Sequence, residues 1–247
     1  MKPILLIPAR LAATRLPAKP LADIGGVPMI VRVMRQAMAA DLGPVVVAAG
    51  EREIAAVVEA AGGRAVLTDP ALPSGSDRIH AALEALDPEG RHDVVVNLQG
   101  DLPALDPGQL RKVVTALEES GADIATLAAE IIDPAERDNP HVVKAVVAWR
   151  PGGQLGRALY FTRSRAPSGE GPLFHHVGLY AYRRAALSRF VDLPPSPLEK
   201  REKLEQLRAL EANMSIAVAR VDSVPLSVDT PADLAQAIAF FARKASS

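Results

Sequence analysis

Short apolar runs alternate along the first half of the chain with segments that repeat apolar residues at helical spacing. The apolar runs cover residues 4–7, 45–49, 65–67, 94–98 and 124–128. The helical patterns cover residues 28–40, 51–61, 77–86 and 107–119. The runs are continuous and rich in β-branched residues, which is typical of strands buried on both faces of a parallel sheet. The alternation therefore predicts an α/β fold with three layers and a mostly parallel sheet.

The pattern changes after about residue 132. Three strand-like runs follow with loops between them, at residues 142–149, 158–161 and 177–182. A charged helix is then expected at 198–211, a strand at 216–219 and a closing amphipathic helix at 231–243. No linker divides the chain convincingly. We therefore expect one domain over residues 1–247, with an inserted β-rich section at about 133–190.

Three of the expected helices begin with a capping residue followed by proline. The caps are Asp106, Ser196 and Thr230, and Gln, Glu or Asp stands three residues after each. This arrangement marks helix N-termini, because the cap and the third residue satisfy the first backbone amides. We assign these residues a structural role.

The composition narrows the class of protein. The chain has 247 residues, of which 49% are hydrophobic and 23% charged, so it can bury a sizeable core. Its net charge of −1 argues against a nucleic-acid binder, which would carry a basic excess. The absence of cysteine excludes disulfides, thiolate nucleophiles and cysteine-based metal sites. No signal-peptide pattern and no apolar run of membrane-spanning length occurs, so we expect a cytoplasmic protein without membrane contact.

The first apolar run ends in a basic loop that carries Arg10, Arg15 and Lys19, and residues 1–22 contain no carboxylate. Ligands of open α/β sheets bind at the carboxyl ends of strands, and arginine and lysine suit phosphate groups. The loop matches neither the phosphate-binding loop of nucleoside triphosphatases nor the glycine fingerprint of dinucleotide-binding folds. It is either a phosphate-gathering loop or a solvated basic loop.

Two carboxylates stand near other element ends. Asp101 follows the run at 94–98 after Gly100, and Asp229 precedes the cap Thr230. Mg²⁺ prefers one or two carboxylates together with substrate phosphate oxygens, so both are candidate ligands. The alternatives are a turn residue for Asp101 and a helix-dipole carboxylate for Asp229. Together with the basic loop, the two carboxylates favour a metal–phosphate site.

The second half offers weaker candidates. Arg163 ends a strand-like run and is a candidate for binding a substrate carboxylate. His175 and His176 are adjacent on a strand and point to opposite faces, so they cannot both ligate one metal. Glu202, Glu205 and Gln206 are most simply part of a solvated helix face.

Several segments resemble one family in order along essentially the whole chain. The first, residues 7–30, reads IPARLAATRLPAKPLADIGGVPMI. The later segments are SGSDR at 74–78, NLQGD at 97–101, NP at 139–140, YFTR at 160–163, HVGLY at 176–180, PSPLE at 195–199, LEQLR at 204–208 and VDTP at 228–231. Together they resemble the 3-deoxy-D-manno-octulosonate cytidylyltransferases, the CMP-KDO synthetases. Sialic-acid cytidylyltransferases resemble only the first segment.

The resemblance implies a Rossmann-like nucleotide-diphospho-sugar transferase fold and a homodimer formed through the section at about 133–190. It implies transfer of CMP from CTP to 3-deoxy-D-manno-octulosonate (KDO) with release of pyrophosphate and a requirement for Mg²⁺. The product serves lipopolysaccharide assembly, so the source would be a bacterium with an outer membrane. The alternatives are a related acceptor, such as 8-amino-KDO or a sialic acid, and a non-catalytic CTP-binding relative.

The resemblance also assigns roles to single residues. It implies that the triphosphate of CTP is held by Arg10, Arg15 and Lys19, and that Ser74 and Arg78 border the cytosine. Mg²⁺ would be held by Asp101 and Asp229. The sugar acid would be held by Gln99, which also borders CTP, and by Arg163, His176, Glu205 and Gln206. The catalytic set is then Arg10, Lys19, Asp101 and Asp229.

The chain departs from the family pattern at several positions. Gly50 stands where Asp is expected, Leu102 where Glu is expected and Ala18 where Gly is expected; Ala13-Thr14 replaces Ser-Thr. These departures leave open how the groups around the metal and sugar are positioned, but not the reaction.

Overall fold

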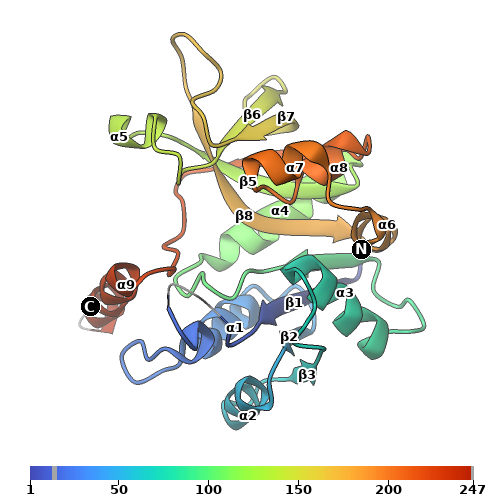
Figure 1. The fold of residues 1–247 in the computed structure, drawn as a ribbon, viewed down its shortest axis with the longest axis vertical. Helices are drawn as coiled ribbons and strands as arrows, with labels where there is room; N and C mark the ends of the chain where they lie inside the picture. Colours follow the sequence, from blue (N-terminus) through green and yellow to red (C-terminus); the bar gives the residue numbers. More distant parts are fainter. Residues whose placement is uncertain (13–15, 246–247) are drawn as a thin grey trace. The chain divides into compact units, whose positions relative to one another are not determined.

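The computed structural model describes residues 1–12 and 16–245 (Figure 1). It divides into two compact units. The parallel-sheet unit comprises Lys2–Leu110 and Pro225–Ser247, and the mixed-sheet unit comprises Arg111–Val224 together with Met1. Among the described residues, no helix combines the length and the apolar character that crossing a membrane requires.

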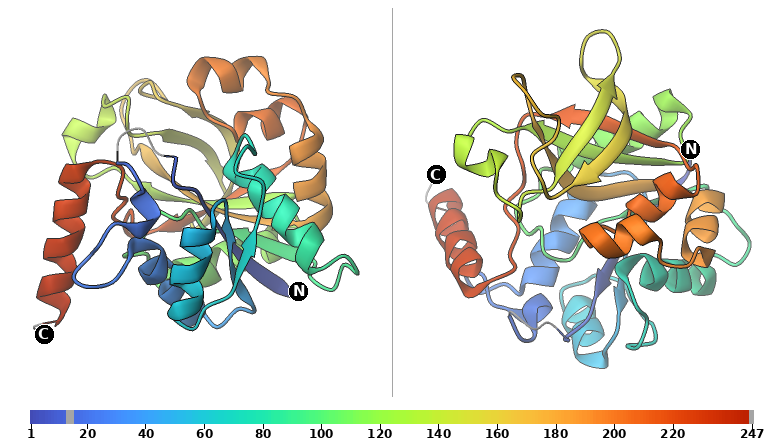
Figure 2. Two further views of the ribbon diagram at one scale, coloured as in Figure 1. Left: turned by 60° about the horizontal axis from the view of Figure 1, so that its bottom comes forward. Right: turned by 45° about the horizontal axis from the view of Figure 1, so that its top comes forward.

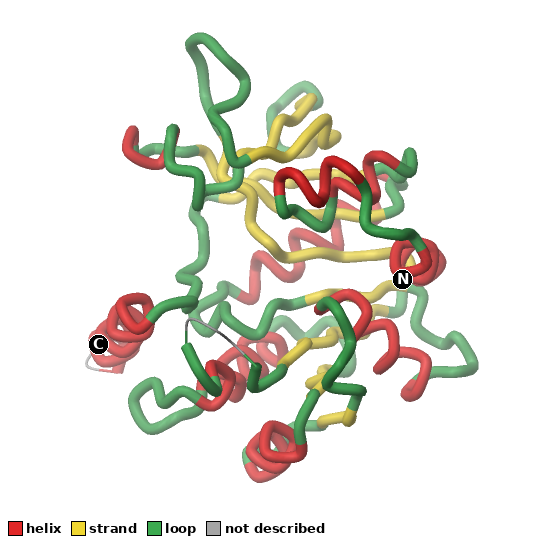
Figure 3. Tube along the Cα trace, viewed as in Figure 1, coloured by secondary structure: helices red, strands yellow, loops and turns green. Residues whose placement is uncertain are grey.

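The parallel-sheet unit alternates strands with helices (Figure 3). Its strands are β1 (Pro3–Ala9), β2 (Val45–Ala49), β3 (Ala65–Leu67) and β4 (Val94–Asn97). Its helices are the single-turn η1 (Lys19–Leu21), α1 (Met29–Ala39), α2 (Arg52–Ala60), α3 (Gly75–Leu86) and α9 (Pro231–Ala245), while α4 (Pro107–Ser120) leads into the other unit. The strand order is β3-β2-β1-β4, and every pair is parallel. This part of the sheet confirms the parallel arrangement expected from the continuous apolar runs.

The core of this unit explains that sequence pattern. Ile4, Leu5, Leu6 and Ile7 of β1 are each at most 3% exposed, and β4 is buried along its whole length. A strand that is covered on both faces needs apolar residues at successive positions, which removes the alternation of a half-buried strand.

The mixed-sheet unit holds β5 (Ile124–Glu130), β6 (Lys144–Trp149), β7 (Leu155–Thr162), β8 (Phe174–Arg183) and β9 (Ile216–Val221). β5 pairs with β9 in parallel, whereas the pairs β5–β8, β6–β7 and β7–β9 are antiparallel. A further contact between β6 and β8 closes the five strands into a ring (Figure 2). The expectation of a mostly parallel sheet is therefore wrong for this unit. One reason is that β6 and β7 are joined by a connection too short for a parallel crossover.

The helices of the mixed-sheet unit differ from the expectation as well. They are α5 (Pro134–Arg137), α6 (Arg184–Asp192), α7 (Pro197–Glu202) and α8 (Leu207–Glu211). The single helix expected at 198–211 is wrong, because α7 ends at Lys203, which has a left-handed backbone with φ 56°. At this end of the helix, Arg163 Nε donates a hydrogen bond to the carbonyl of Glu202 at 2.9 Å. The helix therefore stops where the side chain of the residue after β7 binds its last turn.

The three expected caps are confirmed. Asp106 Oδ1 accepts from the Gly108 amide, Ser196 forms a complete capping box with Glu199, and Thr230 exchanges hydrogen bonds with Asp233. The section expected at about 133–190 lies within the mixed-sheet unit, and its role in dimer formation stays a prediction.

Candidate functional site

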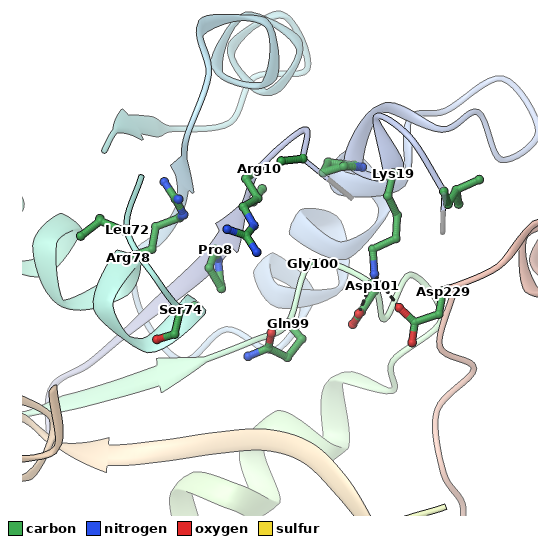
Figure 4. A pocket seen from close by; sticks show the side chains of 15 residues that line it. Pro8, Arg10, Lys19, Leu72, Ser74, Arg78, Gln99, Gly100, Asp101 and Asp229 are labelled. Carbon is green, nitrogen blue, oxygen red and sulfur yellow. Dashed lines mark hydrogen bonds and ion pairs between the residues drawn. The ribbon is translucent and has the colours of Figure 1, made fainter. Parts of the chain in front are cut away.

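The strand order places a crevice at the carboxyl ends of β1 and β4. The chain moves outward from β1 to β2 and β3 and then returns to the other side of β1 to form β4. Loops that leave two neighbouring strands in opposite directions open a ligand crevice between them. A cavity of about 380 Å³ lies there (Figure 4). Seven sequence-predicted residues line it: Arg10, Lys19, Ser74, Arg78, Gln99, Asp101 and Asp229.

Arg10 enters the cavity directly from the end of β1. The strand ends at Ala9, whose carbonyl accepts from the Gly50 amide at 2.8 Å, so β1 and β2 end side by side. Arg10 is exposed, and its guanidinium extends toward the middle of the cavity (Figure 4). Arg15, the next cation of the loop, lies outside the described residues.

Glu51 fixes the start of the basic loop, a role that the sequence did not suggest. It is the N-cap residue of α2, but its carboxylate does not cap that helix. Instead Glu51 Oε2 accepts from the Leu11 amide at 2.9 Å, forty positions away in the chain. The residue next to Arg10 is therefore anchored to the end of β2.

Lys19 is placed by a strained turn. Ala18 has a left-handed backbone, with φ 53°, and η1 begins directly after it. A residue with a Cβ pays about 1–2 kcal/mol for this conformation, whereas glycine adopts it readily. This explains why glycine is expected there from the family pattern. Strain of this kind is typical of functional positions.

The Lys19 ammonium binds both candidate metal ligands. Its Nζ lies 2.9 Å from Asp101 Oδ2 and 2.9 Å from Asp229 Oδ1 (Figure 4). Burial lowers the pKa of Lys19, but the charges and hydrogen bonds of Asp101 and Asp229 outweigh it, so the net pKa lies above the usual value. The amine is therefore protonated at neutral pH.

Asp101 reaches the cavity through a close backbone approach. A Cβ on the preceding Gly100 would lie 3.0 Å from the carbonyl oxygen of Pro8, so a side chain there would crowd β1. Gln99, one residue earlier, lines the cavity and donates to Asn97 Oδ1 at 3.1 Å.

Asp229 is held beside Asp101 by the returning C-terminal segment. The Val228 amide donates to the Asp101 carbonyl at 2.9 Å. Val228 is fully buried, in a cluster with Ile24, Met29 and Ala237. The hydrogen bond of the Val228 amide and the buried Val228 side chain therefore hold Asp229 next to residues from the first half of the chain.

Ser74 and Arg78 belong to the first turns of α3. Ser74 is the N-cap, and its Oγ accepts from the Asp77 amide at 3.1 Å. Arg78 is 2% exposed, and its Nη1 donates to Thr68 Oγ1 at 2.6 Å and to the Asp69 carbonyl at 3.1 Å. Both residues line the cavity, but the Arg78 guanidinium fastens the loop after β3.

The remaining candidates lie in the mixed-sheet unit, and Arg163 is used structurally there. Its Nη1 donates to the Pro140 carbonyl at 3.1 Å, and its backbone amide donates to Glu202 Oε2 at 3.0 Å. Thr162 donates to the other oxygen of the same carboxylate at 2.8 Å. Glu202, read from sequence as part of a solvated helix face, thus organises the end of β7.

His176 is a buried, neutral residue on β8. Its Nε2 lies 3.0 Å from Thr126 Oγ1, and its ring packs edge-on against Phe161 with centroids 4.8 Å apart. Burial, assisted by the neighbouring His175, lowers the pKa of His176 to about 3. An uncharged imidazole can bind hydroxyl groups, but it cannot neutralise a carboxylate.

Gln206 carries an unsatisfied donor. The side chain is 6% exposed, and its Nε2 has no hydrogen-bond partner among the described residues. A buried amide without a partner costs about 1–3 kcal/mol, so it marks a position where a ligand oxygen is expected. The neighbouring Glu205 adds its charge near Tyr180, whose pKa is raised by burial first and then by Tyr182 and Glu205. These contacts replace the solvated face predicted for Glu205 and Gln206 from helical spacing alone.

This chain is similar to known proteins in both sequence and structure. The cytidylyltransferase family model matches residues 4–216. The 3-deoxy-manno-octulosonate cytidylyltransferase of Rhodospirillum centenum is 66% identical, over 95% of this chain and 91% of its own. That of Parvibaculum lavamentivorans is 65% identical, over 98% and 93%.

A solved structure of CMP:2-keto-3-deoxy-manno-octonic acid synthetase complexed with CTP is also similar. Its TM-score is 0.91 and its sequence identity 36%, over 99% of this chain and all of that one. The chain belongs to the 3-deoxy-manno-octulosonate cytidylyltransferase family. The resemblance read from the sequence is thereby confirmed, together with a fold of mixed α/β content and a nucleotidyltransferase activity.

Two departures from the family pattern have local explanations. A Cβ at Gly50 would lie 3.1 Å from Arg78 Nη1 and 3.4 Å from Arg10 Cβ, so a side chain there would be crowded by the two arginines. Glu51 brings a carboxylate to the same region from the next position. Leu102 is 6% exposed and is part of the buried core.

The Glu51 contact predicts an effect on triphosphate binding. Glu51→Ala removes the acceptor of the Leu11 amide and should weaken binding of CTP about tenfold, the equivalent of one hydrogen bond. Glu51→Gln keeps an acceptor oxygen and should stay within about threefold of wild type. Isothermal titration calorimetry with CTP measures both. Equal losses in the two variants would contradict the positioning role.

The buried neutral His176 predicts a dependence of stability on pH. Its folded pKa of about 3 lies below the unfolded value, so the unfolded chain binds more protons and stability falls as the pH drops below about 6.5. Between pH 7 and 5 this residue should cost about 2 kcal/mol of unfolding free energy. Urea unfolding at pH 7 and pH 5 measures this difference in unfolding free energy, which should be smaller in His176→Gln than in wild type. An unchanged difference would show that His176 is protonated in the folded protein.

Proposed function

We propose that this protein transfers CMP from CTP to KDO and releases pyrophosphate. The observation that carries the proposal is one cavity at the ends of β1 and β4 that holds cations suited to a triphosphate beside two converging carboxylates. Relatives at 65% and 66% identity carry this activity in their names, and a structural neighbour was solved with CTP.

The reaction needs charge stabilisation more than covalent chemistry. The C2 hydroxyl of the sugar acid attacks the α-phosphorus, a new C2–O–P bond forms, the bond to pyrophosphate breaks, and the proton of the hydroxyl is released to solvent. Negative charge gathers on the leaving pyrophosphate, and fixed cations stabilise it. Arg10 extends into the cavity and suits this task, since a guanidinium can bind two phosphate oxygens at once. Lys19 also lines the cavity and adds a second positive charge from the same loop.

The carboxylate pair suits a magnesium ion. Asp101 and Asp229 already converge on a single cationic group, the Lys19 ammonium, with one oxygen of each at 2.9 Å. Two carboxylates that lie partly open to solvent, beside a phosphate-binding cavity, form the donor set that Mg²⁺ prefers. When bound, the ion would polarise phosphate oxygens and lower the pKa of the attacking hydroxyl. Asp101 and Asp229 would hold it.

Other parts of the proposal rest on the family resemblance and on topology. We infer a three-layer Rossmann-like arrangement, because right-handed crossovers put α1 and α2 on one face of the parallel sheet and α3 on the other. Binding of the sugar acid by Gln99, Arg163, His176, Glu205 and Gln206 remains a prediction. So do the homodimer, the cytoplasmic location, and the product's use in lipopolysaccharide synthesis.

The function is tested by pyrophosphate release from CTP and Mg²⁺ with either KDO or N-acetylneuraminate. Release with KDO alone is expected. Release with N-acetylneuraminate at a comparable rate would mean a different acceptor, and binding of CTP without release would mean a non-catalytic relative.

Substitution of the two carboxylates, Asp101 and Asp229, tests the metal site most directly. Asp101→Asn and Asp229→Asn should each lower kcat roughly 100-fold or more, because a neutral amide holds a divalent cation poorly. Asp41→Asn is the matched control, since Asp41 is exposed in a left-handed turn that asparagine also accepts. Circular dichroism checks the fold. Turnover near wild type in either site variant would remove that residue from the metal site.

A further inference from the structure

A single ammonium group occupies the space between the two carboxylates of the cavity. Lys19 Nζ lies 2.9 Å from one oxygen of Asp101 and 2.9 Å from one oxygen of Asp229 (Figure 4). The lysine side chain is 18% exposed, and the carboxylate side chains are 25% and 38% exposed. The Lys19 ammonium is a specific bridge, because it donates to two carboxylates that lie 82 and 210 positions further along the chain.

This bridge conflicts with simultaneous metal binding. A magnesium ion binds carboxylate oxygens at about 2.0–2.1 Å, so an ion shared by Asp101 and Asp229 would lie close to the place that Nζ holds now. A divalent ion and an ammonium group at such a distance repel each other strongly. Lys19 must therefore leave the carboxylates before they can ligate a metal.

Neither ligand can complete the exchange by itself. A metal ion alone would displace the Lys19 ammonium without offering it a new anion. A triphosphate alone would attract Lys19 away from Asp101 and Asp229, and the phosphates would then face two carboxylates that had lost its charge. When both bind, the metal neutralises the carboxylates and the phosphate oxygens receive the lysine.

The geometry of Lys19 permits this movement. Its backbone is fixed in η1, where the Lys19 amide donates to the Leu16 carbonyl at 3.1 Å and the Leu21 amide donates to the Ala18 carbonyl at 2.8 Å. Its charge lies at the end of a flexible four-carbon chain. The head group can turn from the carboxylates to the open cavity that Arg10 enters while the backbone stays in place.

We propose that Lys19 is the resident cation of the carboxylate pair and yields its place to a divalent metal only when a triphosphate receives it. Metal and nucleotide then bind cooperatively, because each removes the obstacle to the other. This inference rests on the proposed function, since it assumes that Asp101 and Asp229 hold the metal.

The first test measures binding of Mn²⁺ alone by electron paramagnetic resonance, without nucleotide. Lys19→Gln removes the resident charge and should bind Mn²⁺ about tenfold more tightly than wild type, a typical size for coupled sites. Lys2→Gln is the matched control, because it removes the same charge before β1, at the end of the strand away from the cavity, and should behave as wild type. Adding Asp101→Asn to Lys19→Gln should abolish the gain. Equal Mn²⁺ affinity in Lys19→Gln and wild type would overturn the proposal.

A second test uses the wild-type protein and does not depend on how the variant folds. Equilibrium dialysis should show that CTP increases protein-bound Mn²⁺ about tenfold or more. CMP, which has no β- or γ-phosphate to receive Lys19, should not. Equal effects of CTP and CMP would overturn the coupling, even if pyrophosphate release from CTP and KDO is normal. A different pair of results would reject the proposed function instead. In that case the wild-type protein releases no pyrophosphate from CTP and KDO, and Asp101→Asn binds Mn²⁺ as the wild type does.

Discussion

The ion pairs of Lys19 with Asp101 and Asp229 join three segments that are distant in sequence. The lysine comes from the loop after β1, the first aspartate from the end of β4, and the second from the segment before α9. Each segment also has its own anchor, namely the buried strands, the bond between the Val228 amide and the Asp101 carbonyl, and the cluster around Val228. The charges need these anchors, because partly exposed ion pairs contribute too little energy to hold three segments together.

The same arrangement concentrates opposite charges at a crevice that the topology creates. Arg10 and Lys19 come from the β1 side, and Asp101 comes from the β4 side. A site with both signs can hold a triphosphate and a divalent cation together, whereas a purely basic loop would bind only the anion. The strain at Ala18 and the close approach of Gly100 to Pro8 are local costs of bringing these groups to one place.

Much of the parallel-sheet unit could be predicted because its signals are local. Continuous apolar runs specify buried strands, and cap residues specify helix starts. The mixed-sheet unit was harder, since its strand pairing depends on contacts that no local pattern contains. The break between α7 and α8 shows this most directly, because the end of α7 binds Arg163, a residue about forty positions earlier in the chain.

In the site, too, some features could be predicted from local sequence signals and others could not. The cations after β1 and the carboxylates near β4 and α9 follow from strand ends and residue type. The direction of the Arg78 guanidinium toward Thr68, and the bond that the Leu11 amide donates to Glu51, could not be predicted. The family resemblance assigned Arg78 to the ligand, and no local pattern places the Glu51 carboxylate on an amide forty positions away. The family resemblance supplied roles for Glu205 and Gln206, which helical periodicity alone had placed on a solvated face.

The most direct test of the account is a pair of crystal structures, one without ligands and one with CTP and Mn²⁺. Anomalous scattering in the second would locate the metal without reference to residue roles. We predict a manganese peak between Asp101 and Asp229, with Lys19 Nζ moved from the carboxylates to a phosphate oxygen. A peak elsewhere, or a lysine that still bridges the two aspartates beside bound metal and CTP, would contradict it.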